Sequence, residues 1–138
     1  MNYFDVNWLA ILVATIASMA LGAAWYMGLS KQWLAATGKT VEEIKAGSGA
    51  NATPFIWSAL MQLVMAYFLA LLTPPILGDV TIANTVVVGI HLWAGFMVTS
   101  MVMNQRYEGQ KWSLALINGG YMLGIMLVQG VVIGLFGA

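Results

Sequence analysis

The sequence contains no cysteine and very few charged residues. The absence of cysteine excludes disulfides, thiolate metal sites, iron–sulfur clusters and cysteine nucleophiles. Charged residues make up 7% of the 138 residues, whereas a soluble domain carries roughly a quarter. The chain has five Lys or Arg, five Asp or Glu and no net charge, which is too few basic residues to follow a phosphate backbone. A water-soluble globule and a nucleic-acid-binding protein are therefore both excluded.

The common enzyme signatures are also missing. There is no Walker motif, no dinucleotide-binding glycine fingerprint and no HExxH zinc motif. Adjacent carboxylates occur only at Glu42 and Glu43, where the sequence favours the start of a helix. We therefore expect no enzyme activity, no cofactor and no metal site.

What the sequence does contain is long apolar runs, since 61% of its residues are hydrophobic. A transmembrane helix needs about 20 mostly apolar residues to cross the hydrocarbon core of a bilayer. Four such stretches lie at about residues 7–29, 54–73, 81–104 and 113–136, and every Lys, Arg, Asp and Glu falls outside them. Because helices satisfy their own backbone hydrogen bonds in lipid, the sequence predicts an all-α fold. We expect one integral membrane domain over residues 1–138, a four-helix transmembrane bundle in the lipid bilayer.

Local signals mark the ends of these stretches. Thr53 is expected to cap the second span, because the following Pro54 suits the first helical position. Pro74 and Pro75 are expected to end the second span, and Asp79 and Thr81 are candidate caps for the third.

The first loop contains the longest polar segment. Thr40 followed by Glu43 matches a capping box, in which each side chain reaches the other's backbone N–H. We expect a short amphipathic, interfacial helix that runs to about Ala46 and stops at Gly47. The rest of the loop is interpreted as a solvated connector, with a partner-docking site as the alternative.

The basic residues are distributed unevenly between the loops. The first loop (30–53) and the third loop (105–112) contain all five of them, which are Lys31, Lys39, Lys45, Arg106 and Lys111. Cytoplasmic loops are enriched in Lys and Arg. We therefore expect both of these loops to be cytoplasmic, and both termini to be periplasmic or external.

Five polar side chains within the spans form a candidate polar pathway or ligand face: His91, Asn84, Gln62, Asn118 and Gln129. Each would gain a hydrogen-bond partner inside the bundle and avoid lipid. As the only ionisable residue in a span, His91 is a candidate functional residue. The alternative is a neutral histidine that hydrogen-bonds to Gln129 or to a backbone carbonyl and has a structural role.

Small residues recur at four-residue spacing in the first and last spans. This pattern lets helix backbones approach closely in lipid. It predicts a helix-packing or homo-oligomer face made of Gly120, Gly124, Gly130 and Gly134 in the last span, with Ser18 and Gly22 in the first. Packing within one chain and contact between copies both remain open.

Several short segments resemble a known family. They read NWLA at 7–10, LGAAWY at 21–26, KQWL at 31–34, TGKT at 37–40, WAGF at 93–96 and INGGY at 117–121. Together they are similar to a bacterial membrane protein family catalogued as domain of unknown function 1761. The resemblance covers nearly the whole chain. It implies a small four-span protein of the bacterial inner (plasma) membrane, with no established activity and no assigned catalytic residues.

Three functional hypotheses follow. The first is a small homo-oligomeric carrier, channel or binding protein for a small solute, which would use the inner polar face. The second is a non-catalytic accessory or assembly subunit of a larger membrane complex. A membrane enzyme that works from a few scattered polar residues is the least favoured.

Overall fold

The computed structural model describes residues 2–48 and 52–138. Three continuous helices, α1 (Trp8–Gly28), α4 (Thr53–Leu77) and α7 (Trp112–Phe136), are long and apolar enough to cross a membrane. The fourth span, Ile82–Tyr107, consists of α5 (Ile82–Leu92), the π-helical turn η1 (Trp93–Met97) and α6 (Val98–Tyr107). The chain is thus a multi-pass, all-α membrane protein, and the predicted four-helix bundle is confirmed.

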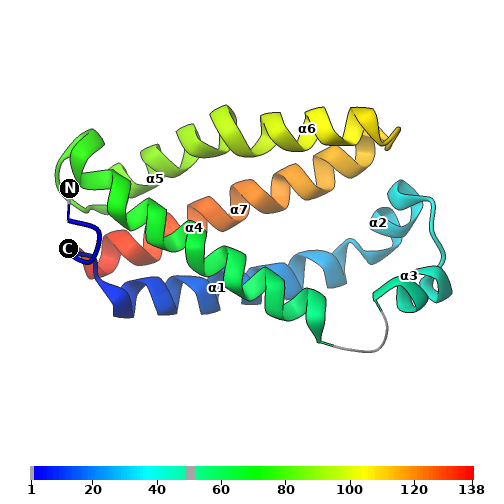
Figure 1. Ribbon diagram of the computed structural model, residues 1–138, viewed down its shortest axis with the longest axis horizontal. Coiled ribbons are helices and arrows are strands. Elements are labelled where there is room, and N and C mark those ends of the chain that lie inside the picture. Colours follow the sequence, from blue (N-terminus) through cyan, green and yellow to red (C-terminus); the bar gives the residue numbers. More distant parts are fainter. Residues whose placement is uncertain (1, 49–51) are drawn as a thin grey trace.

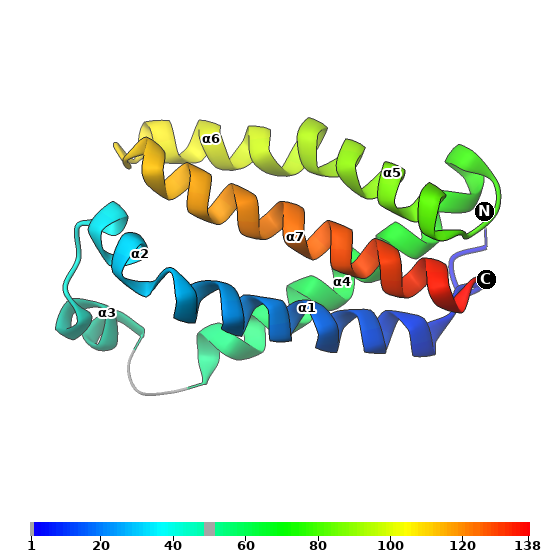
Figure 2. The ribbon, with the colours of Figure 1, turned by 180° about the vertical axis from the view of Figure 1, so that it is seen from behind.

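Helix α7 occupies the middle of this bundle (Figure 1, Figure 2). It contacts α1, α4 and all three segments of the third span. The two chain termini lie at one end of the bundle, and the short helices α2 (Ser30–Thr37) and α3 (Val41–Ser48) lie at the other, beside the turn between α6 and α7 (Figure 1).

Side-chain caps explain where several helices begin. The Asn7 side chain accepts a hydrogen bond from the backbone N–H of Ala10, and Thr81 caps α5 in the same way. In the loop, the backbone N–H of Glu43 donates to the Thr40 hydroxyl at 3.1 Å. Such caps satisfy N–H groups that have no partner within the helix. The predicted short helix is therefore confirmed as α3.

Three features of the helices differ from the expectation. Helix α4 begins at Thr53 itself, so Ala52 and not Thr53 occupies its N-cap position. Helix α4 does not end at the proline pair but continues through Pro74 and Pro75 to Leu77. Each proline lacks one backbone N–H, yet the helical backbone continues, and the backbone N–H of Gly78 closes the last turn on the Pro74 carbonyl. Helix α2 was not expected, and Gly38 ends it in a left-handed conformation (φ 72°) that glycine adopts without strain.

The glycines of α7 are engaged within the chain. A Cβ atom at Gly120 or Gly124 would lie 3.0 or 2.8 Å from side chains of α1, and one at Gly130 would lie 3.1 Å from the backbone of Val86 in α5. A Cβ at Gly134 would overlap the backbone of Ile82. Of the two interpretations of this face, packing within one chain is the one that the structure shows.

Candidate functional site

Three polar side chains meet at the centre of the bundle, one each from α1, α4 and α7. Ser18 donates to Gln62 Oε1 at 2.6 Å, and Gln129 Nε2 donates both to Ser18 Oγ (3.2 Å) and to the Gln62 carbonyl (2.9 Å). Ser18 and Gln129 are fully buried and Gln62 is 3% exposed. Buried polar groups are costly unless they pair, so this cluster ties three helices together in a fixed register.

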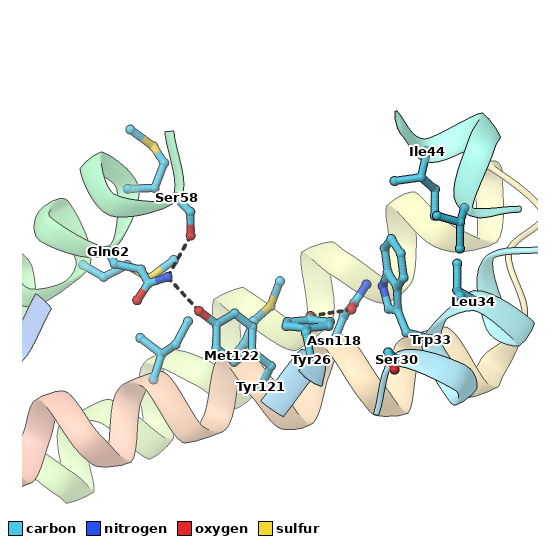
Figure 3. A pocket seen from close by; sticks show the side chains of 14 residues that line it. Tyr26, Ser30, Trp33, Leu34, Ile44, Ser58, Gln62, Asn118, Tyr121 and Met122 are labelled. Atoms are coloured by element: carbon cyan, nitrogen blue, oxygen red, sulfur yellow. Dashed lines mark hydrogen bonds between the residues drawn. The ribbon is translucent and has the colours of Figure 1, made fainter. Parts of the chain in front are cut away.

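Gln62 links this central cluster to a more open region. Its Nε2 donates one hydrogen to Ser58 at 2.9 Å and the other to the Tyr121 hydroxyl at 2.8 Å (Figure 3). Its Oε1 already accepts from Ser18. Both ends of the Gln62 amide are therefore used within the protein.

A second polar pair lies one helical turn closer to the loop end of α7. The Tyr26 hydroxyl donates to Asn118 Oδ1 at 2.7 Å. The Tyr26 ring also makes edge contacts with two other rings, Tyr121 at 5.1 Å and Trp33 at 6.1 Å between centroids. These rings connect α1, α2 and α7 along one side of the bundle.

Both polar groups border a pocket of about 750 Å³ near the loop end. Its walls come from five helices and are mostly aliphatic, aromatic and Met side chains, with hydroxyl and amide groups between them (Figure 3). The lining residues are Tyr26, Ser30, Trp33, Leu34, Val41, Ile44, Ser58, Met61, Gln62, Met65, Asn118, Tyr121, Met122 and Ile125. None of them is charged.

The course of α4 explains why the pocket lies at this end. Helix α4 crosses α1 obliquely and moves away from α6 and α7 toward the loop end (Figure 1, Figure 2). The helices α2 and α3 cover the space that opens, with Trp33 and Leu34 from α2 and Val41 and Ile44 from α3. The Nζ of Lys111 holds α2 against the third loop through the Ala35 carbonyl at 3.1 Å.

The predicted polar face is only partly assembled. Gln62 and Gln129 meet at the centre, and Asn118 lies beside the pocket. Asn84 instead donates to the carbonyls of Leu77 and Asp79 and so braces the turn before α5.

His91 is also absent from this face. It is exposed on the outer side of α5, and its Nδ1 lies 2.8 Å from the Val87 carbonyl. It borders a separate hollow of about 210 Å³ between α4 and α5. The geometry thus matches the backbone-carbonyl alternative for His91, and the inner face loses both Asn84 and His91.

Of the fourteen lining residues, only Gln62 and Asn118 were among the predicted site residues. The polar and aromatic residues Tyr26, Trp33, Ser58 and Tyr121 were missed. Tyr26 and Tyr121 end two of the segments that carry the family resemblance, LGAAWY and INGGY. That signal was available in the sequence. The contact between α1 and α7 that brings the two tyrosines together was not.

The family described as Protein of unknown function (DUF1761) matches residues 9–134. The chain belongs to this family. The matched range contains both polar clusters and every residue of the pocket. No curated protein and no solved structure matches the chain.

The DUF1761 pocket offers neutral hydrogen-bonding groups and apolar surface. In the part of the chain that the structure describes, no three His, Asp or Glu side chains converge to hold a metal ion. Hydroxyl and amide groups at these positions can orient a bound molecule.

Proposed function

We propose that this protein is a membrane-embedded binding protein or carrier for a small lipophilic solute. The observation that carries the proposal is the pocket of about 750 Å³ with apolar and aromatic walls and a few polar groups. Ligand sites typically measure about 300–1,000 Å³ and combine mostly hydrophobic walls with a few placed polar groups. The proposed role is binding or transport of the solute without a chemical reaction.

The polar groups favour a lipophile over an ion or a hydrophilic solute. The central residues Ser18, Gln62 and Gln129 hydrogen-bond to one another and are buried. The polar atoms that border the pocket belong to neutral side chains. Moving an ion from water into such an environment is costly, whereas an apolar solute gains by leaving water.

Native mass spectrometry of the protein released from nanodiscs tests this function. We expect wild-type protein to retain a small molecule of defined mass, and Met122→Trp to lose it because the indole fills the pocket. Phe96→Trp is the matched control, since Phe96 is 74% exposed on the outside of the bundle. Equal retention by wild type and Met122→Trp, or no retained molecule after lipophiles are supplied, would contradict the proposal.

We also propose that the pocket opens on the cytoplasmic side. The two loops that contain all five basic residues lie at the same end of the bundle, where Lys111 contacts the Ala35 carbonyl (Figure 1). Basic loops favour the cytoplasmic side, and this orientation places both termini outside.

Single-cysteine labelling tests the orientation cleanly, because the chain has no native cysteine. Lys39 and Asp79 are exposed at opposite ends of the bundle. An impermeant maleimide should label Asp79→Cys in intact cells and Lys39→Cys only after permeabilisation. The reverse pattern would overturn the proposed orientation.

A second candidate function, an accessory or assembly subunit, is favoured by the third span. Only 17% of an 18-residue apolar stretch of this span is buried within the protein, whereas 28 to 33% is buried in the other three spans. A Cβ at Gly95 would meet no atom within 4 Å, and the neighbouring Phe96 is exposed. This outer face is therefore free to pack against another membrane helix.

Cross-linking from Gly95→Cys distinguishes the possible partners. A product of twice the chain mass indicates a homo-oligomer, and a foreign subunit indicates an accessory role. Ile16→Cys, on the exposed side of α1, is the control. If Gly95→Cys forms no more product than Ile16→Cys, this candidate is rejected.

A further inference from the structure

We propose that the solute is an uncharged lipophile with a hydrogen-bond acceptor of the carbonyl type, and that the Asn118 amide donates to this acceptor. The inference rests on the proposed binding function of the pocket and specifies its ligand. Three observations carry it, namely the free donor, the neutral walls and the depth of the donor in the bundle.

The free donor is the Nδ2 group of Asn118. Its companion atom Oδ1 accepts the short hydrogen bond from the Tyr26 hydroxyl, which leaves Nδ2 as the free end of the amide. Nδ2 points away from Tyr26, on the side of Trp33 (Figure 3). Asn118 lines the pocket, and among the residues that the structure describes its Nδ2 donates to no protein atom. An –NH₂ group has two hydrogens and no acceptor capacity, so the complementary group on a ligand must be an acceptor.

The other amide in the pocket does not compete for this role. Gln62 gives its two Nε2 hydrogens to Ser58 and Tyr121, and its Oε1 accepts from Ser18. Of the two amides in the pocket, Asn118 is therefore the one that keeps an unpaired donor.

The walls specify the rest of the ligand. Trp33, Tyr26 and Met122 present aromatic and thioether surface around the amide, and the pocket has no charged lining residue. A carboxylate or phosphate bound there would lose its hydration without gaining a countercharge. An uncharged molecule with a ring or chain meets only favourable apolar contacts.

The position of Asn118 along α7 determines how strong a hydrogen bond its amide can make to a ligand carbonyl. The residue lies six positions after the start of α7 at Trp112, which places it about 9 Å along the helix axis from the loop end. A carbonyl bound there exchanges with water that reaches the donor from the loop end, so the pairing is worth about one ordinary hydrogen bond.

Two matched probes test the inference, decanophenone and decylbenzene, which differ by one carbonyl. Their apparent dissociation constants, in mole fraction of probe, would be measured from the thermal stabilisation of the full-length protein in nanodiscs of ether-linked phosphatidylcholine. We expect decanophenone to bind about tenfold more tightly, the value of one hydrogen bond. In Asn118→Leu the two probes should bind equally.

Asn84→Leu is the matched control, because it is the same substitution outside the pocket and it removes the two hydrogen bonds that Asn84 donates. It should keep the tenfold preference. The comparison of probes on wild-type protein needs no variant, so it stands even if Asn118→Leu does not fold.

The outcomes separate this inference from the function on which it rests. Equal binding of both probes to wild-type protein would overturn carbonyl recognition and leave lipophile binding in place. Binding of neither probe would overturn both. Tighter binding of 4-decylbenzoate than of decanophenone would overturn the choice of an uncharged ligand.

The same carbonyl chemistry has two possible sources, a free lipophile and the ester group of a bilayer lipid. Repeating the decanophenone titration in ester-linked phosphatidylcholine distinguishes them. Unchanged affinity supports a free solute, whereas weaker apparent affinity supports a lipid ester as the natural occupant. Both results are consistent with an uncharged carbonyl ligand.

Discussion

The two ends of the bundle are packed in different ways. At the end that holds the termini, α7 approaches α5 so closely that Gly130 and Gly134 face the backbone of Val86 and Ile82. The Thr85 hydroxyl adds a short hydrogen bond to the Gly130 carbonyl across the same contact. At the loop end, α7 meets side chains, and the pocket lies beside it.

The difference depends on what each glycine faces. Gly120 and Gly124 are opposite the side chains of Trp25 and Leu21 in α1, which keep the two helices further apart than a backbone contact would. The same four-residue spacing of glycines thus gives a close contact with the backbone of α5 in one half of α7. In the other half it gives a wider contact with side chains of α1. Glycine spacing shows where helices can approach closely, and the residue on the neighbouring helix decides whether they do.

The largest effect is expected from Gly134→Leu at the closed end. No flexible side chain can move aside there, because the opposing atoms belong to the backbone of Ile82 and Thr81. The free energy of unfolding should fall by about 3 kcal/mol, the upper part of the usual range for overpacking. Thermal or SDS-induced unfolding in detergent would measure this.

Gly95→Leu is the control for that substitution, because a Cβ added at Gly95 would meet no atom of another helix within 4 Å. Its stability should stay within about 1 kcal/mol of wild type. A similar loss of stability in both variants would mean that the close contact between Gly134 and the backbone of Ile82 is not the cause.

The sequence was sufficient to predict the four spans and the starting points of several helices. The charged residues fall between the spans, and Thr40 and Thr81 cap helices where a local signal predicted them. The continuation of α4 through Pro74 and Pro75 was missed, because a proline pair reads as a stop unless it is known to lie at the last turn. Helix α2 was missed as well, and its anchoring contact with Lys111 comes from a distant loop.

The sequence identified the amide side chains of the candidate site, but it did not predict how the site is arranged in space. Gln62, Gln129 and Asn118 were identified because polar side chains in a span need partners. Asn84 and His91 were placed with them by helical spacing, yet one braces a turn and the other lies on the outer face. In a membrane, both the inner and the outer face of a helix are apolar, so spacing alone does not say which face is inward.

A smaller effect is expected from Gln62→Leu, which lies between the two ends. The substitution removes the hydrogen bonds that the side chain shares with Ser18, Ser58 and Tyr121. Because membrane hydrogen bonds are individually modest, the free energy of unfolding should fall by about 1.5 kcal/mol. Unfolding in SDS would again provide the measurement.

Gln105→Leu is the matched control, since Gln105 is also buried but its Oε1 has no hydrogen-bond partner within the described chain. Losing an unpaired acceptor costs little, so this variant should stay within about 0.5 kcal/mol of wild type. If the two glutamine variants are equally destabilised, the polar cluster contributes packing volume and not specific bonds.

The smallest effect is expected from Lys111→Met at the open end. It removes the bond between Nζ and the Ala35 carbonyl, an exposed contact whose loss should cost about 0.5 kcal/mol. Although global stability hardly changes, α2 loses a tether to the rest of the bundle. The backbone amides of residues 30–37 should therefore exchange hydrogen several-fold faster by mass spectrometry, while those of α5 stay unchanged.

Lys31→Met controls for the loss of a positive charge, because Lys31 is exposed on α2 itself and should leave exchange at wild-type rates. Faster exchange in both variants would attribute the effect to charge and not to the tether. Since Trp33 and Leu34 of α2 form part of the pocket wall, a specific effect of Lys111 would mean that the third loop holds that wall in place. The open end would then owe its shape to contacts between loops, whereas the closed end owes its shape to helix backbones.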